Sequence, residues 1–201
     1  MSDFPISLHG ERIKAVIIGG GTVGTRKALS LIEAGAQVTV VAPQITEELA
    51  EAERMHRVGI VRGEYASERI KGMNLVIAAT SSRGVNAQIA VDAQSNGQLV
   101  NITDYPDEGN FHTMALHRSG DITIAVSSGG VPGAAMRIRD AIAERFDSRY
   151  ERAVTLLRGL RARSLANGDD RWKDAASRLL GGDFCDSVEN GSFADKADSW
   201  R

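Results

Sequence analysis

The sequence predicts an α/β protein in which a parallel sheet covered by helices is followed by an antiparallel hairpin and then by helices alone. Three observations favour this class. In residues 1–112, short β-branched runs alternate with segments of helical period, which is the rhythm of βαβ units. Beyond residue 112, two alternating runs joined by "HRSGD" predict a β-hairpin. Helical patterns then fill most of the remaining chain.

The first part is expected to supply all strands of the parallel sheet. These strands are predicted at "KAVIIG", "AQVTVVAP", "GIVRG", "MNLVIAAT" and "QLVNITD". Helical periods between them predict helices from Thr22 to about Ala34, from Thr46 to His56 and from Val85 to Ser95. Crossovers through these helices make the strands parallel and cover both faces of the sheet.

The second part is expected to contain the hairpin and three further helices. The helices are predicted from Pro132 to about Phe146, from Arg149 to about Leu165 and from Arg171 to Leu180. The final stretch, "GDFCDSVENGSFADKADSWR", has no period and many polar residues, which predicts a disordered tail. The predicted division is therefore a parallel-sheet domain, a hairpin-and-helix segment, a helical domain and a tail, at residues 1–112, 113–147, 148–182 and 183–201.

Composition and charge exclude several classes of protein. The formal net charge of -2 provides no basic field that would favour nucleic acid. The longest apolar run, "AVIIGGG", is too short to span a membrane, and the first residues lack the apolar region of a secretory signal. We therefore expect a cytoplasmic protein. Cys185 is the only cysteine, which excludes an internal disulfide. The sequence also lacks a Cys/His cluster of the kind that holds a stable metal ion.

A glycine-rich loop follows the first predicted strand. Gly19, Gly21 and Gly24 form the pattern GxGxxG between an apolar strand and a helix, which is the context that this motif needs. Glycine permits the tight turn at the first position, close approach of a pyrophosphate at the second, and close packing of helix on strand at the third. The amides of Thr22 and Val23 then face the anion. The loop predicts a Rossmann-type dinucleotide site.

The second predicted strand ends without the acid that usually holds the adenosine ribose. Its last residues read "VAP", so the ribose hydroxyls are expected to meet backbone groups near Pro43 and Gln44. No lysine or arginine stands there to meet a 2′-phosphate, and the next base along the chain is Arg54. NAD is therefore favoured over NADP as the cofactor.

Polar residues follow two later strands, at the sheet edge where ligands bind in open parallel sheets. Thr80 follows "LVIAA", and Asp104 follows "LVNIT". A carboxylate at the mouth of a cofactor crevice can act as a general base. Asp104 also opens "DYPDEG", where aspartate is an ordinary turn residue. The residues alone leave both interpretations open.

Several blocks together resemble the precorrin-2 dehydrogenase and sirohydrochlorin ferrochelatase family of sirohaem biosynthesis. They include "KAVIIGGGTVGTRKA", "LVIAATSSRGVNAQIA" and "VNITDYPDEGNFHTMALHRSGDITIAVSSGG", and the likeness runs from Phe4 to about Arg163. The resemblance implies an NAD-binding Rossmann domain, a dimerisation segment that interlocks with a second copy, and a small helical domain. That family also lacks the acid after the second strand. One departure is Gly24, where the family more often has alanine.

The resemblance implies NAD-dependent oxidation of precorrin-2, a tetrapyrrole, to sirohydrochlorin. It places the catalytic base on Asp104 and favours this role over that of a turn residue. It places cofactor contacts on Thr22, Val23, Pro43 and Gln44. With the glycines and the strand end, the expected cofactor residues are Gly19, Gly21, Thr22, Val23, Gly24, Pro43, Gln44 and Thr80.

Such a substrate carries many carboxylates, so its pocket is expected to be basic. Ser128 lies in "SSGGVPG", which can form an anion-binding nest at a helix N-terminus, and the family has a serine of interest there. Arg137 and Arg139 fit two interpretations equally well: they bind substrate carboxylates, or they lie on a solvent-exposed helix face without any role in binding. The candidate substrate residues are His112, His117, Arg118, Ser128, Arg137 and Arg139.

Two alternative functions stay open. Some relatives also insert ferrous iron into sirohydrochlorin, and Asp104 could assist that step by taking pyrrole protons. In an alternative of another class, the chain is a non-catalytic NAD-sensing module in which Asp104 is only a turn residue.

The predicted hairpin indicates that the chain forms an oligomer. A two-stranded sheet with one helix is only marginally stable alone, and "DITIAV" forms an apolar edge strand. We therefore expect a homodimer.

Overall fold

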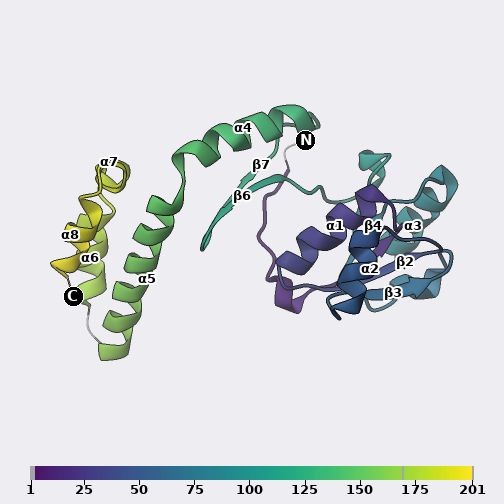
Figure 1. The fold of residues 1–201 in the computed structure, drawn as a ribbon, viewed down its shortest axis with the longest axis horizontal. Coiled ribbons are helices and arrows are strands. Elements are labelled where there is room, and N and C mark those ends of the chain that lie inside the picture. The colour runs from purple at the N-terminus through teal and green to yellow at the C-terminus, as the bar shows by residue number, and fades with distance from the viewer. Residues whose placement is uncertain (1–2, 169, 201) are drawn as a thin grey trace. The chain divides into compact units, whose positions relative to one another are not determined.

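The computed structural model describes residues 3–168 and 170–200. The chain divides into two compact units, Met1–Thr113 and Met114–Arg201, which we call the first and the second unit. The first holds the parallel sheet, and the second holds the hairpin and the later helices (Figure 1). None of the helices formed by the described residues is long and apolar enough to cross a membrane.

The first unit is built on a five-stranded parallel sheet with the strand order β3-β2-β1-β4-β5. This is the order of a Rossmann fold, so the predicted fold class is confirmed. At the reversal point of the order, β1 and β4 are neighbours, and Ile18 pairs with Ala78 at their carboxyl ends. Ligands bind at this point in such folds. The strands are β1 (Lys14–Ile18), β2 (Gln37–Ala42), β3 (Gly59–Arg62), β4 (Leu75–Ala78) and β5 (Leu99–Ile102).

Helices cover both faces of this sheet (Figure 1). α1 (Thr22–Glu33) and α2 (Glu47–Arg54) pack on one face, and α3 (Arg83–Ser95) packs on the other. Successive strand residues point to opposite faces, so Ile17 belongs to the core under α1 and Val16 to the core under α3. Burial on both faces explains why the predicted strands consist mostly of apolar residues.

Capping residues set where two of these helices begin. The hydroxyl of Thr46 accepts a hydrogen bond from the amide of Leu49 at 3.4 Å and caps α2. The hydroxyl of Ser82 accepts from the amide of Val85, also at 3.4 Å, and caps α3. α3 therefore begins at Arg83 and not at the predicted Val85, because Ser82 satisfies a backbone donor that the apolar period does not reveal.

The hairpin of the second unit is formed as predicted. β6 (Ala115–Ser119) and β7 (Ile122–Val126) pair in antiparallel register. The turn between them contains Gly120, whose φ of 54° lies in the left-handed region that glycine adopts without strain. α4 (Pro132–Arg145) packs along both strands.

The described residues that follow α4 in the second unit form a core of four helices. The prediction of a disordered tail over 183–201 is wrong for residues 183–200, because two short helices form there and pack on α5. Val188 is only 4% exposed and Phe193 only 3%. Each of these helices has 6 residues, which is too short for a helical period to appear in the sequence. The helices are α5 (Ser148–Asn167), α6 (Arg171–Leu179), α7 (Phe184–Glu189) and α8 (Phe193–Asp198).

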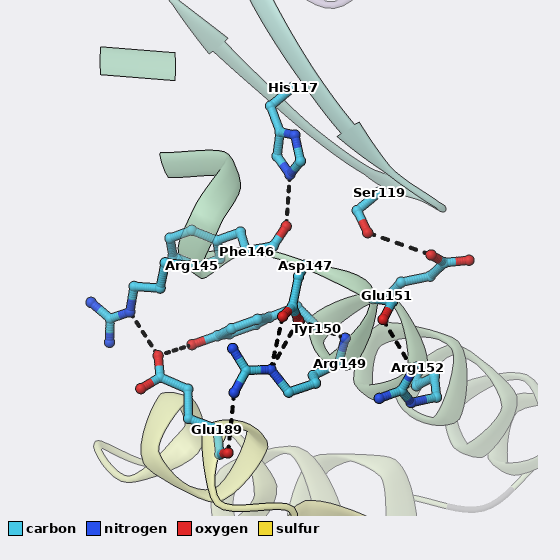
Figure 2. A network of polar contacts seen from close by, with 11 residues as sticks. His117, Ser119, Arg145, Phe146, Asp147, Arg149, Tyr150, Glu151, Arg152 and Glu189 are labelled. Carbon is cyan, nitrogen blue, oxygen red and sulfur yellow. Dashed lines mark hydrogen bonds and ion pairs between the residues drawn. The ribbon is translucent and has the colours of Figure 1, made fainter. Parts of the chain in front are cut away.

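A polar network joins α7 to the start of α5 (Figure 2). The hydroxyl of Tyr150 donates to Oε1 of Glu189 at 2.7 Å, and Nε of Arg145 donates to the same oxygen at 2.7 Å. Burial, and then the bond to Glu189, raises the pKa of Tyr150. The bonds from Tyr150 and then Arg145 lower the pKa of Glu189. The network therefore holds two segments together that are distant in sequence.

Candidate active site

The glycine loop between β1 and α1 has no space for a side chain at two of its glycines and open space at a third. Gly19 has a φ of 119°, and a Cβ at this position would lie 2.2 Å from the carbonyl oxygen of Ala79. A Cβ at Gly24 would lie 2.0 Å from the carbonyl oxygen of Gly19. At Gly21, by contrast, a Cβ would meet nothing within 4 Å. The loop therefore has the shape of a cradle that a pyrophosphate can approach at Gly21.

The residues expected around the cofactor lie at the rim of this cradle. Thr22 and Val23 are exposed in the first turn of α1, whose leading amides have no partner within the helix. Pro43 and Gln44 are exposed directly after β2. The structure thus brings the glycine loop and the end of β2 to the same edge of the sheet.

Two threonine hydroxyls tie these loops together. Oγ1 of Thr25 lies 2.8 Å from Oγ1 of Thr46 and donates to the carbonyl oxygen of Gly21 at 3.0 Å. The amide of Thr46 donates to the carbonyl oxygen of Gly20 at 3.2 Å. Neither threonine was among the predicted site residues. A helix was predicted to begin at Thr46, but the contact of this residue with Thr25 depends on the fold.

The residues that directly follow β2, with sequence PQIT at 43–46, contain no carboxylate and no base. Arg62, which lies beside Ala42 on β3, pairs with Glu53 at 2.9 Å. Arg54, the next base along the chain, pairs with Glu47 at 2.8 Å and also with Glu51 on its own helix. These hydrogen bonds raise the pKa of Arg54. Its guanidinium is therefore satisfied within α2.

A buried asparagine lies across the reversal point from the glycine loop. Asn86 in α3 is 0% exposed. Its Nδ2 donates to Oδ1 of Asp104 at 2.9 Å and to the carbonyl oxygen of Thr80 at 3.2 Å. Its Oδ1 accepts from the hydroxyl of Thr80 at 2.7 Å and from the amide of Thr80 at 3.3 Å. These bonds link Thr80, two residues after β4, to Asp104, two residues after β5. Asp104 itself is exposed.

Asn86 was missed by sequence reasoning, although the sequence holds a signal for it. It stands three residues before Ile89 and four before Ala90, both of which are buried in α3. A polar residue within the apolar stripe of a helix needs hydrogen-bond partners inside the protein. Thr80, a predicted cofactor residue, is one of those partners, so its hydroxyl bonds within the protein.

A cation lies close to Asp104 at the start of α3. Arg83 forms an ion pair with Glu108, and its guanidinium carbon lies 5.0 Å from the centre of the Tyr105 ring. The bond to Glu108 raises the pKa of Arg83, and the charge of Asp104 adds to this effect. Arg83 therefore places a positive charge over the residue that follows Asp104, and sequence reasoning missed this cation too.

The candidate substrate residues are divided between the two units. His112 is exposed near the end of the first unit. His117 lies on β6, where its Nε2 is 2.6 Å from the carbonyl oxygen of Phe146 (Figure 2). Arg118 and Arg137 are exposed in the second unit. The contact of His117 joins the hairpin to the end of α4.

Two further candidates make local bonds in the second unit. Arg139 pairs with Asp140 at 2.6 Å and donates to the carbonyl oxygen of Leu116 at 3.4 Å. The hydroxyl of Ser128 donates to the carbonyl oxygen of Val131 at 2.5 Å, just before α4 begins. Among the residues that the structure describes, no group of three or more His, Cys, Asp or Glu side chains could hold a metal ion.

The strand order, the glycine cradle and the open sheet edge define a Rossmann-type dinucleotide-binding protein. Residues 6–115 match the family model described as "Putative NAD(P)-binding". This match covers more than half of the chain, and the chain belongs to that NAD(P)-binding family.

Similar proteins extend the comparison beyond the first unit. Siroheme synthase from Chromobacterium violaceum is 34% identical over 199 residues, which cover 96% of this chain and 42% of that protein. Siroheme synthase from Ectopseudomonas mendocina is 39% identical over 166 residues, which cover 82% of this chain and 33% of that protein. This chain thus spans less than half of the length of these curated relatives.

A solved structure shares the fold of the whole chain. It is described as "SirC, precorrin-2 dehydrogenase", and it matches with a TM-score of 0.79 and 23% sequence identity. The match covers 98% of this chain and 100% of that chain. The second unit therefore has a counterpart in a known structure.

Proposed function

We propose that this chain catalyses the oxidation of precorrin-2 to sirohydrochlorin, with NAD as the hydride acceptor, in sirohaem biosynthesis. One observation carries the proposal: a carboxylate, Asp104, is held at the carboxyl edge of the sheet in a dinucleotide-binding unit. Similar proteins that match most of the chain are named siroheme synthases, which supports this reaction. The shared fold with a protein named precorrin-2 dehydrogenase agrees with it.

The residues of the first unit fit a bound dinucleotide. The open side at Gly21 lets a pyrophosphate approach, and the leading amides of α1 at Thr22 and Val23 can donate to it. Pro43 and Gln44 are exposed where the adenosine ribose lies in such folds, and we propose that their backbone groups meet its hydroxyls. NAD is favoured over NADP, because the nearby Arg54 bonds within α2 and offers no free cation for a 2′-phosphate.

In this proposal Asp104 acts as the general base. When bound, NAD supplies the hydride acceptor for the reduced macrocycle. Loss of one hydride and one proton converts precorrin-2 to sirohydrochlorin, and Asp104 takes the proton at its carboxylate. Asn86 and Thr80 hold the base at the strand ends where the crevice opens. A positioned base contributes about 10²- to 10⁴-fold to the rate.

The second unit is proposed to supply substrate contacts and a dimer interface, and the enzyme to act in the cytoplasm. Val131, Met136 and Ile138 at or near the start of α4 are 57%, 50% and 49% exposed. Exposed apolar residues beside a two-stranded sheet favour cover by a second copy of the chain. The proposed contacts to substrate carboxylates are Ser128, Arg118, His112, His117, Arg137 and Arg139.

The reaction is tested with precorrin-2 generated without oxygen and mixed with the protein and NAD. We expect the absorbance of sirohydrochlorin and of NADH to rise together. The Asp104→Ala variant should be slower by about 10²-fold or more. Asp107→Ala is a matched control, because Asp107 is an exposed carboxylate in the same loop.

The possible outcomes separate the alternatives. Equal loss of rate in the Asp104 and Asp107 variants would contradict the assignment of the base. Binding of NAD without turnover would contradict the enzymatic proposal and support an NAD-sensing module. Adding ferrous iron to the product then tests whether the chain also inserts the metal, and replacing NAD with NADP tests the choice of cofactor.

A further inference from the structure

We propose that Asn86 is a positioning residue for the base, and that it holds one oxygen of Asp104 so that the other accepts the substrate proton. This inference rests on the proposed function, since it concerns how Asp104 works in that reaction. It is drawn from the four hydrogen bonds of one buried side chain.

The orientation of the Asn86 amide is fixed by its neighbours. Its Oδ1 faces the backbone amide of Thr80, which can only donate, and the hydroxyl of Thr80 at 2.7 Å. Its Nδ2 faces the carbonyl oxygen of Thr80 and Oδ1 of Asp104, which both accept. A flipped amide would place oxygen against two acceptors and nitrogen against an amide donor. Asn86 therefore presents an N–H to Asp104.

This N–H leaves Asp104 with two different oxygens. Oδ1 is held at 2.9 Å by Nδ2 of Asn86. Within the described part of the chain, no hydrogen bond reaches Oδ2. Because Asn86 is 0% exposed and bonded on all sides, it restrains an otherwise exposed carboxylate. A carboxylate that is fixed in position and keeps one oxygen without a hydrogen bond is suited to take a proton from a bound substrate.

The charges around Asp104 define what else can alter its behaviour. Arg83 at the start of α3 pairs with Glu108 and lies over the ring of Tyr105. The loop that holds Asp104 contains these two residues and also the carboxylate of Asp107. The glycine loop, with sequence GGGTV at residues 19–23, and the loop "ATSS" at residues 79–82 contain no ionisable side chain. Asn86 is uncharged, so substituting it with alanine tests its hydrogen bond to Asp104 without changing the charge around that carboxylate.

A structural role alone would have a different signature. If Asn86 only fastened the loop at Thr80, an acceptor at this position would be sufficient. Asn86→Asp keeps an acceptor for both donors of Thr80, but it replaces the N–H that faces Asp104 with a second carboxylate oxygen. Two neighbouring carboxylates share a proton up to a higher pH than one alone.

The kinetic test therefore compares Asn86→Asp and Asn86→Ala with the wild type across pH. For Asn86→Asp we expect the ascending limb of the kcat profile to move up by about one pH unit or more. For Asn86→Ala we expect kcat to fall by about 10²-fold with little change in KM. Asn101→Ala is the control, because Asn101 is also buried but donates to the carbonyl oxygen of Phe111. An unmoved limb in Asn86→Asp would overturn the proposal.

A second measurement needs neither activity nor a variant that folds. The side-chain amide resonance of Asn86 is followed by NMR in the wild-type protein as the pH is lowered. We expect it to shift together with the carboxyl carbon of Asp104, whereas the amide resonance of Asn101 does not follow that carbon. An Asn86 amide that does not follow the Asp104 titration would overturn the proposal.

The two measurements distinguish failure of this inference from failure of the proposed function. If the wild type does not oxidise precorrin-2, the proposed function is wrong, and the NMR titration alone decides whether Asn86 holds Asp104. If the wild type is active and the Asn86 variants keep its kcat and pH profile, the function stands and the positioning role is wrong. Binding of NAD and circular dichroism verify that each variant is folded.

Discussion

The hydroxyl oxygens of Thr25 and Thr46 lie 2.8 Å apart, although the two residues belong to different βα connections. Thr25 is in the first turns of α1, and Thr46 caps α2. Their contact joins the glycine loop after β1 to the loop after β2, the two loops that form the proposed cofactor site. The two halves of the proposed cofactor site are therefore positioned as one body.

Removing this contact should weaken cofactor binding. Thr25→Val keeps the volume of a buried side chain but leaves the Thr46 hydroxyl and the Gly21 carbonyl oxygen with one partner fewer. We expect NAD affinity to fall by up to about tenfold, equivalent to about 1.4 kcal/mol. Isothermal titration calorimetry checks this. Thr25→Ser restores the hydroxyl and should restore affinity; a Thr25→Val protein that binds NAD as the wild type does would show that the loops are not coupled.

The glycines at 21 and 24 should respond differently to the same substitution. Gly24→Ala puts a methyl group 2.0 Å from the Gly19 oxygen, so the loop or α1 must move. Overpacking of this kind costs about 1–3 kcal/mol. Gly21→Ala meets nothing within 4 Å, and its φ of -79° suits alanine. We expect Gly24→Ala to lower the melting temperature, and Gly21→Ala to leave it unchanged while NAD binding weakens.

This pair carries its own control, since the chemical change is identical. Thermal melting and NAD titration are measured on both variants. Equal stability of the two would contradict the close approach of α1 to the loop. Unchanged NAD binding in Gly21→Ala would contradict the open side as the place where the pyrophosphate approaches.

Acid should destabilise the second unit through Glu189. Its pKa is lowered from 4.5 by the bonds from Tyr150 and then Arg145. The contribution of Glu189 to the free energy of unfolding is therefore fully present above pH 4.5. It is lost as the pH falls through the lowered pKa that Glu189 has in the folded protein. We expect Glu189→Gln to be less stable than the wild type at pH 7 and to lose less stability on acidification.

Tryptophan fluorescence can follow this transition in the full chain. The chain has 2 tryptophans, Trp172 and Trp200, and both lie in the second unit. Glu64→Gln, in the first unit, controls for the change in net charge and should leave the fluorescence transition unchanged. Parallel pH profiles for the wild type and Glu189→Gln would show that the network in Figure 2 does not carry the acid sensitivity.

The sequence was informative where one local signal sets one local structure. Alternating strand and helix periods predicted the parallel sheet, and the run around Gly120 predicted the hairpin. The tail was predicted wrongly because α7 and α8 are each shorter than two turns and owe their order to packing on α5. Tertiary contacts of this kind leave no periodic trace in a single sequence.

The residues of the candidate site were likewise predicted where a local signal identifies them and missed where their role depends on the fold. Glycine at positions 19, 21 and 24 and the strand ends at Thr80 and Asp104 were predicted, because motif spacing and strand direction determine which residues reach the sheet edge. Asn86 was missed, because its role depends on three segments meeting in space. The roles of the arginines and histidines of the second part stay predictions, since their partners cannot be identified from spacing alone.

The bond between Tyr150 and Glu189 has a consequence for the order of events during synthesis. Every strand of the parallel sheet has been made by Ile102, so the first unit can fold while the ribosome is still translating the second. The second unit cannot close its core until Phe193 and Ala197 have been added. Until then the apolar face of α5 lacks the residues that cover it in the finished protein, whereas the first unit already has every strand of its sheet.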